Sequence, residues 1–148
     1  MKICDTQRIL VMDDEPRLVE MYRYLIGAAY PEVHVDVALN GVDGMESFKR
    51  CHHGVVILDL SMPVMDGEQV FQAMLTHCAK AEWNMPCAIF CSGYLPPAWM
   101  EDVVEASSNN LVLQKPIDSG TMLAGIGRML EQSRILSSDA KERISCQD

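Results

Sequence analysis

Five polar side chains that could bind a metal ion or a phosphoryl group follow short apolar runs of this sequence. Asp13 and Asp14 follow the first run, and Asp59, Ser92 and Lys115 follow three later ones. Three carboxylates held close together would repel one another unless a cation neutralised them, and their oxygen atoms favour Mg2+ or Mn2+. A divalent ion and an ammonium both stabilise the charge of a phosphoryl group in transfer. These residue types therefore indicate phosphoryl-transfer chemistry.

Apolar runs and amphipathic segments alternate along the chain and predict the elements that would position these side chains. The predicted strands cover residues 8–12, 33–37, 55–58, 87–91 and 111–113. The predicted helices cover about 16–26, 42–48, 66–82, 96–107 and 122–136. Near-continuous apolar strands separated by helices imply an α/β fold with a parallel sheet covered on both faces. The five polar residues would then meet at the carboxyl edge of that sheet, where such folds place their sites.

Helix capping is a simpler interpretation of the same acids. Asp13 or Asp14 would cap the helix that begins near Pro16, and Asp66 is expected to cap the third helix. Capping accounts for one acid after a strand, but it explains neither the adjacent pair nor the late lysine. We therefore expect a shared pocket in addition to the cap at Asp66.

Four motifs resemble, in order, those of response-regulator receiver domains. They are Val-Met-Asp-Asp-Glu-Pro at 11–16, Val-Ile-Leu-Asp-Leu-Ser-Met-Pro-Val-Met-Asp-Gly at 56–67, Phe-Cys-Ser-Gly-Tyr at 90–94 and Leu-Gln-Lys-Pro at 113–116. The resemblance covers roughly residues 7–135. It implies a flavodoxin-like fold, a doubly wound (βα)5 domain with a five-stranded parallel sheet. We expect this receiver domain over residues 1–136 and a frayed polar tail over 137–148.

The resemblance implies a role for each acidic residue. Asp59 would be the phosphoacceptor, attacking phosphorus with a carboxylate oxygen to form an acyl phosphate, and it would also contact the ion. Asp14 would bind Mg2+ directly, whereas Asp13 would bind it chiefly through water. The backbone carbonyl of Ser61 would supply a further metal ligand.

The resemblance assigns the remaining chemistry to Lys115 and Ser92. Lys115 would pair with Asp59 and then with the phosphoryl oxygens, and the Lys115–Pro116 peptide would be cis. Ser92 would hydrogen-bond a phosphoryl oxygen and move inward when it is present. The added charge of about -1.5 to -2 would reshape the face of the fourth helix, fifth strand and fifth helix, which is the usual output surface.

Three positions would tune the switch in a protein of this family. An aromatic residue often stands three positions before the lysine, but this sequence has Val112, so the aromatic part of the switch is absent or supplied by another residue such as Tyr94. Ser61 and Tyr94 occupy the positions two residues after the phosphoacceptor and two after the hydroxyl. A bulky Tyr94 would shield the acyl phosphate from water. Alternatively, Tyr94 is an ordinary aromatic residue of the loop with no such role.

The composition is typical of one soluble globular domain. The chain has 148 residues, 49% of them hydrophobic, and a formal net charge of -9 that disfavours contact with nucleic acid phosphates. No apolar run approaches the roughly 18 residues of a membrane span, and no signal peptide is apparent, so we expect a cytoplasmic protein with no membrane contact. Six cysteines without CxxC spacing indicate reduced, mostly structural thiols.

The run Cys51-His52-His53 suggests a metal site. Adjacent residues on a helix point about 100° apart, however, and cannot easily share one ion. We therefore expect a helix end followed by Gly54 rather than a metal site.

Two other functions compete with a signalling receiver. A haloacid-dehalogenase-type phosphatase also uses an aspartyl nucleophile, Mg2+ and a lysine. It needs a second acid where Ser61 stands, and its paired acids come late in the chain. A pseudo-receiver used only for docking would account for Val112 in place of the aromatic switch residue. It does not explain why all the site residues are present.

We expect a phosphoacceptor rather than an enzyme, phosphorylated by a sensor histidine kinase or a histidine phosphotransfer protein. About a dozen residues follow the last predicted helix, too few for a DNA-binding output domain. The signal would then pass to a downstream protein, along a relay or into a phosphate sink. A stand-alone regulator and a receiver from a larger hybrid kinase are both compatible with the sequence, as are a monomer and a weak homodimer.

Overall fold

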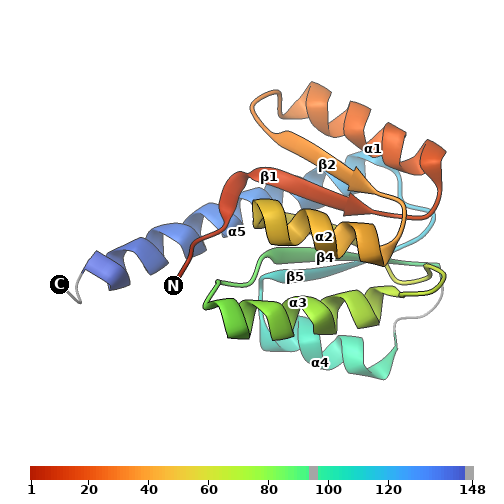
Figure 1. Cartoon of the computed structure of the whole chain (residues 1–148). Coiled ribbons are helices and arrows are strands. Elements are labelled where there is room, and N and C mark those ends of the chain that lie inside the picture. The colour runs from red at the N-terminus through yellow and green to blue at the C-terminus, as the bar shows by residue number, and fades with distance from the viewer. Residues whose placement is uncertain (94–96, 146–148) are drawn as a thin grey trace.

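The computed structural model describes residues 1–93 and 97–145 as an open parallel sheet with helices on both faces (Figure 1). The strands are β1 (Asp5–Met12), β2 (His34–Ala38), β3 (His53–Asp59), β4 (Cys87–Ser92) and β5 (Asn110–Gln114). The helices are α1 (Pro16–Ala29), α2 (Gly41–Cys51), α3 (Gly67–Ala81), α4 (Ala98–Ala106) and α5 (Ser119–Ser145). All neighbouring strands are parallel, in the order β2-β1-β3-β4-β5. The predicted doubly wound α/β fold is confirmed.

Alternating side chains of the strands form two apolar cores, one on each face of the sheet. In β1, Ile9 and Val11 enter the core that α1 and α5 cover, whereas Leu10 and Met12 enter the core covered by α2, α3 and α4. All four are fully buried, as a strand between two helical layers requires. The near-continuous apolar runs of the sequence therefore reflect burial on both faces.

The strand order places a topological switch point between β1 and β3. From β1 the chain proceeds to one edge of the sheet through β2, and from β3 it proceeds to the other edge through β4 and β5. Connections leave in opposite directions from the carboxyl ends of these two neighbouring strands, which opens a crevice there. Asp13 directly follows β1 and Asp59 ends β3, so both acids lie at this crevice.

Two side-chain caps set the starts of α2 and α3. Asn40 accepts a hydrogen bond from the backbone N–H of Asp43 at 2.8 Å. Asp66 and Gln69 form a reciprocal capping box, in which each side chain accepts from the other's backbone N–H at 2.9 Å. The predicted cap at Asp66 is confirmed.

The end of α2 lies where the Cys51-His52-His53 run predicted it, but His52 supplies the cap. His52 adopts the left-handed conformation at φ 48°, and its N–H donates to the carbonyl of Phe48 at 2.8 Å. His53 is the first residue of β3. The geometric objection to a shared ion fails for Cys51 and His53, because the two residues do not lie on one helix.

The prediction of a frayed tail after residue 136 is wrong, because α5 continues to Ser145. Ser133 and Ser137, on either side of residue 136, are buried, and the thiol of Cys4 lies 3.8 and 3.7 Å from their hydroxyl oxygens. The far end of α5 extends beyond the sheet on the side where the N-terminus lies (Figure 1). The helix is longer than its apolar stripe suggests, since small polar residues, not large apolar ones, pack against the N-terminal segment.

The end of β5 has the expected cis peptide bond between Lys115 and Pro116. Within residues 1–93 and 97–145, no helix combines the length and the apolar character needed to cross a membrane.

Candidate functional site

Asp13 is held in place by backbone contacts at the end of β1. Its N–H donates to the carbonyl of Ala38 at 3.2 Å, and its carboxylate accepts from the N–H of Glu15 at 3.0 Å. The residue is 2% exposed, whereas the neighbouring Asp14 is exposed. The N-cap of α1 is Glu15, which makes no side-chain cap bond, so neither Asp13 nor Asp14 is the cap of this helix. The capping interpretation of this pair is wrong.

Asp59 is buried at the end of β3, with 3% exposure. One carboxylate oxygen accepts from the N–H of Ser61 at 3.1 Å, which turns the side chain back toward the start of the following loop. Gly67 lies directly against this turn: a Cβ at Gly67 would be 2.7 Å from the backbone oxygen of Asp59 and 2.8 Å from Cα of Leu60. Only glycine therefore lets α3 begin this close to the acid.

Lys115 connects the two buried carboxylates. Its ammonium nitrogen lies 3.1 Å from Oδ2 of Asp13 and 3.4 Å from Oδ1 of Asp59. Its backbone N–H donates to the carbonyl of Ser92 at 2.7 Å, which ties the end of β5 to the end of β4. The predicted pairing of Lys115 with Asp59 is present, and a shorter contact with Asp13 accompanies it.

The pocket carries more negative than positive charge. Carboxylate oxygens of Asp13, Asp14 and Asp59 all lie within 4.8 Å of one another. Burial, followed by the charge of Asp13, raises the pKa of Asp59 above its usual value, although the N–H of Ser61 and the ammonium of Lys115 oppose this. Burial alone would lower the pKa of Lys115, but contact with Asp13 and Asp59 raises it. One ammonium does not offset three carboxylates, so the pocket attracts a further cation.

The donor atoms fit a hard divalent cation. The cluster offers carboxylate oxygens only, with one exposed member, Asp14, leaving access to solvent. Oxygen ligands of this kind suit Mg2+ or Mn2+, which keep some of their water when bound. The arrangement can therefore hold an ion beside the buried Asp59 carboxylate.

Of the other predicted residues, two lie near the acidic pocket and one lies away from it. Ser92 ends β4 at the same edge of the sheet, is 4% exposed and contacts Lys115 through its backbone. Ser61 is exposed beside Asp59. Val112 lies away from the acidic pocket, half-buried on β5, and lines a hollow of about 290 Å³ with residues of α4. Tyr94 lies outside the described residues.

One positioning residue is missing from the sequence-based set. From the sequence, Gly67 was placed only within the helix predicted over 66–82, yet its hydrogen side chain sets how closely α3 approaches Asp59. The Asp-Gly pair directly after the loop was the sequence signal that could have identified Gly67 as a positioning residue.

Comparison with known proteins identifies sequence relatives over most of the chain. A family model described as response regulator receiver domain matches residues 9–127. The chain is 31% identical over 129 residues to the transcriptional regulatory protein GlrR of Escherichia coli (strain K12), which covers 84% of this chain and 26% of that protein. It is 27% identical over 126 residues to the chemotaxis protein CheY of Treponema pallidum (strain Nichols), with 84% and 83% covered. The chain thus spans about a quarter of GlrR and most of CheY.

Solved structures share the fold at low sequence identity. The crystal structure of a CheY-like response regulator receiver domain protein from Methanospirillum hungatei JF-1 superposes with a TM-score of 0.71 at 17% identity, covering 86% of this chain and 96% of the other. The similarity supports the observed strand order and layers.

Proposed function

Because this chain belongs to the family of response regulator receiver domains, we propose that Asp59 accepts a phosphoryl group from a phosphorylated histidine in a Mg2+-dependent reaction. The observation that carries the proposal is the position of the Lys115 ammonium, 3.1 Å from Asp13 and 3.4 Å from Asp59, at the edge of an acidic cluster. A carboxylate nucleophile, a cation-binding pair of acids and an ammonium are the groups that phosphoryl transfer needs.

Asp13, Asp14 and Asp59 would hold the Mg2+ ion through carboxylate oxygens, with the backbone carbonyl of Ser61 as a further ligand. Bound there, the ion supplies positive charge that offsets the negative charge of the phosphoryl oxygens. The raised pKa of Asp59 supports this assignment, because a cation would favour the ionised, nucleophilic form that burial disfavours.

The side chains of this chain perform the remaining steps. A carboxylate oxygen of Asp59 attacks phosphorus, the bond from phosphorus to the donor's imidazole nitrogen breaks, and the nitrogen keeps the electron pair. Lys115 moves its ammonium from the Asp13 and Asp59 carboxylates onto the new phosphoryl oxygens. Ser92, at the end of the neighbouring strand, donates its hydroxyl to another of these oxygens. The product is an acyl phosphate on the chain itself, so the protein acts as a phosphoacceptor rather than as an enzyme with a separate substrate.

The phosphorylated form would signal through the face of α4, β5 and α5. Its upstream partner would be a sensor histidine kinase or a histidine phosphotransfer protein, and its downstream partner another protein. Val112 stands where the family often has an aromatic switch residue, and it lines the hollow beside α4 with Met100 and Val104. Rearrangement of α4 against β5, rather than rotation of an aromatic ring, would then couple the acyl phosphate to this face.

Intact-mass spectrometry after incubation with acetyl phosphate tests the proposal. We expect one phosphoryl adduct on the wild-type protein that requires Mg2+ and is absent from Asp59→Asn. Asp102→Asn is the matched control, since Asp102 is an exposed acid on α4 away from the pocket, and it should be phosphorylated like the wild type. An unmodified wild-type protein that also fails to bind beryllofluoride would refute phosphoacceptor function and favour a docking module.

A further inference from the structure

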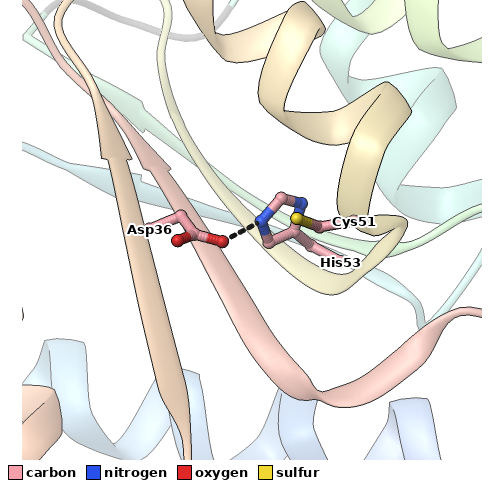
Figure 2. Close-up of side chains that lie close together, drawn as sticks. All are labelled: Asp36, Cys51 and His53. Atoms are coloured by element: carbon pink, nitrogen blue, oxygen red, sulfur yellow. Dashed lines mark hydrogen bonds and ion pairs between the residues drawn. The ribbon is translucent and has the colours of Figure 1, made fainter.

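A second cluster of metal-ligating side chains lies at the opposite end of β3 from Asp59. Asp36 on β2, Cys51 at the end of α2 and His53 at the start of β3 point toward one another (Figure 2). One ligand atom of each lies within 4.8 Å of the other two, and Nε2 of His53 is 2.7 Å from Oδ2 of Asp36. A thiol, an imidazole and a carboxylate therefore share one small space.

A fourth ligand stands on the same edge strand. His34 precedes Asp36 by two residues, so both side chains lie on the same face of β2, and Nε2 of His34 is 3.2 Å from Oδ1 of Asp36. The imidazole of His34 is 61% exposed, whereas that of His53 is fully buried. The cluster thus has one fixed imidazole inside and one adjustable imidazole on the side open to solvent.

The cluster already holds a cationic group. Nη1 of Arg8 donates to Oδ2 of Asp36 at 2.9 Å and to the sulfur of Cys51 at 3.5 Å. Arg8 also has a partner outside the cluster, because its Nε lies 3.4 Å from the carboxylate of Asp5. The guanidinium end can move toward Asp5 and solvent without losing all of its ion pairs.

We propose that Asp36, Cys51 and His53 bind a Zn2+-type transition metal ion, with His34 as the fourth ligand and the ion replacing the guanidinium end of Arg8. A thiolate and two imidazoles select a borderline-soft ion such as Zn2+ or Co2+ over Mg2+. Tetrahedral zinc places neighbouring N, O and S ligands about 3.3–3.6 Å apart, so the three fixed ligands need only small adjustments.

Binding also requires two proton movements. Cys51 binds as the thiolate and releases its proton to solvent. His53 offers the lone pair of Nε2, so its ring proton lies on Nδ1. Among the described residues Nδ1 has no hydrogen-bond partner, and this change of tautomer therefore breaks no bond at that atom.

The proposal goes beyond phosphoacceptor function and stands independently of it. Six residue steps along β3 separate His53 from Asp59, or about 20 Å at about 3.3 Å per residue in a parallel strand. The two sites also differ in donor type, since the pocket at Asp59 offers oxygen alone. A metal at Cys51 would leave phosphorylation of Asp59 chemically possible.

Titration with Co2+ in the presence of excess Mg2+ tests the site. The protein would carry Cys146→Ser. Among the cysteines that the structure describes, Cys51 is then the half-buried thiol, and the other four are buried. We expect one equivalent of Co2+ to give a thiolate-to-cobalt charge-transfer band together with tetrahedral d–d bands, and Zn2+ to abolish both. Excess Mg2+ keeps Co2+ away from the acidic pocket.

Three variants assign the signal. Cys51→Ser should remove the charge-transfer band, and His34→Ala should weaken Co2+ binding at least about tenfold while the thermal midpoint of the apo protein stays unchanged. Arg8→Ala should tighten binding about fivefold or more, because one repelling charge near the ion is lost. Arg50→Ala is the matched control, since it removes an exposed positive charge from α2 nearby and should leave the affinity unchanged.

A missing charge-transfer band in the Cys146→Ser protein, or a band that persists in Cys51→Ser, would overturn the proposal. Weaker binding by Arg8→Ala would also overturn it, because it would show that Arg8 organises the cluster as a structural ion pair. Phosphorylation by acetyl phosphate, measured on the same samples, reports separately on the site at Asp59.

Discussion

Replacing Asp14 by asparagine should stabilise the protein in Mg2+-free buffer, because Asp14 adds a third negative charge to the pocket of Asp13 and Asp59. The carboxylate oxygens of the cluster lie within 4.8 Å of one another, and two unit charges at that upper bound repel by about 0.9 kcal/mol in water. Asp14 is exposed, so the dielectric constant of water applies and the two repulsions add up to about 2 kcal/mol. The Lys115 ammonium offsets part of this, which leaves a net gain of about 1 kcal/mol.

The gain is measurable as a shift of the thermal midpoint. Unfolding entropies of about 2.1 cal/mol/K per residue convert 1 kcal/mol into about 3 °C for a chain of 148 residues. The measurement is calorimetric unfolding of wild type and Asp14→Asn in buffer with a chelator of divalent ions. Asp102→Asn removes the same formal charge from an exposed position on α4, and its midpoint should shift by less than 1 °C.

Mg2+ should reverse the order of the two proteins. At a Mg2+ concentration about one hundred times its Kd, the wild type gains about 2.7 kcal/mol, or about 9 °C. If Asp14→Asn binds Mg2+ at least tenfold more weakly, its gain at the same concentration is at most about 1.4 kcal/mol. A lower midpoint of Asp14→Asn in Mg2+-free buffer, or an equal response of both proteins to Mg2+, would refute the reasoning.

Three further perturbations test the site and its loop. Burial and the charge of Asp13 raise the pKa of Asp59 above its ordinary 3.8, so the folded protein holds this proton more tightly than the unfolded chain. Without Mg2+, the contribution of Asp59 to the free energy of unfolding should therefore fall as the pH rises from 3.8 through the raised pKa of Asp59, and urea titrations of Asp59→Asn should lack this contribution. Gly67→Ala should lower the free energy of unfolding by about 1–3 kcal/mol and slow phosphorylation, because the new Cβ would lie 2.7 Å from the backbone oxygen of Asp59. Gly27→Ala, which meets nothing within 4 Å, is its control, and a similar loss in both would point to a general effect of alanine. Val64→Gly should raise the thermal midpoint by about 3 °C, because Val64 is 94% exposed and its φ of 69° strains a β-branched residue by about 1–3 kcal/mol. The added flexibility of glycine offsets part of this gain, and an unchanged or lower midpoint would count against strain at Val64.

The sequence alone predicted the sheet and the edge at which the chemistry lies. A strand buried on both faces must be apolar over its whole length, so the first polar residues after such runs mark where the strand leaves the core. Asp13 and Asp59 lie where these runs predict, because their positions depend on the strands directly before them. The cap at Asp66 was predictable for the same reason, since capping involves residues three positions apart.

Only the tertiary structure decided which side chains meet across elements. Lys115 lies closer to Asp13 than to Asp59, because the relative positions of β1, β3 and β5 set both distances. Cys4, far away in the sequence, lies against Ser133 and Ser137 of α5. No periodicity within either segment encodes such a contact.

The cluster of Asp36, Cys51 and His53 illustrates the same limit. From the sequence, Cys51 and His53 were expected at a helix end, and Asp36 lay in an unrelated strand. The left-handed cap at His52 turns the chain so that Cys51 and His53 face one space, and the parallel sheet places β2 one strand away from β3, on the other side of β1. Local patterns located the strands and the starts of the helices, whereas packing determines which distant side chains share a site, because packing joins residues that the sequence separates.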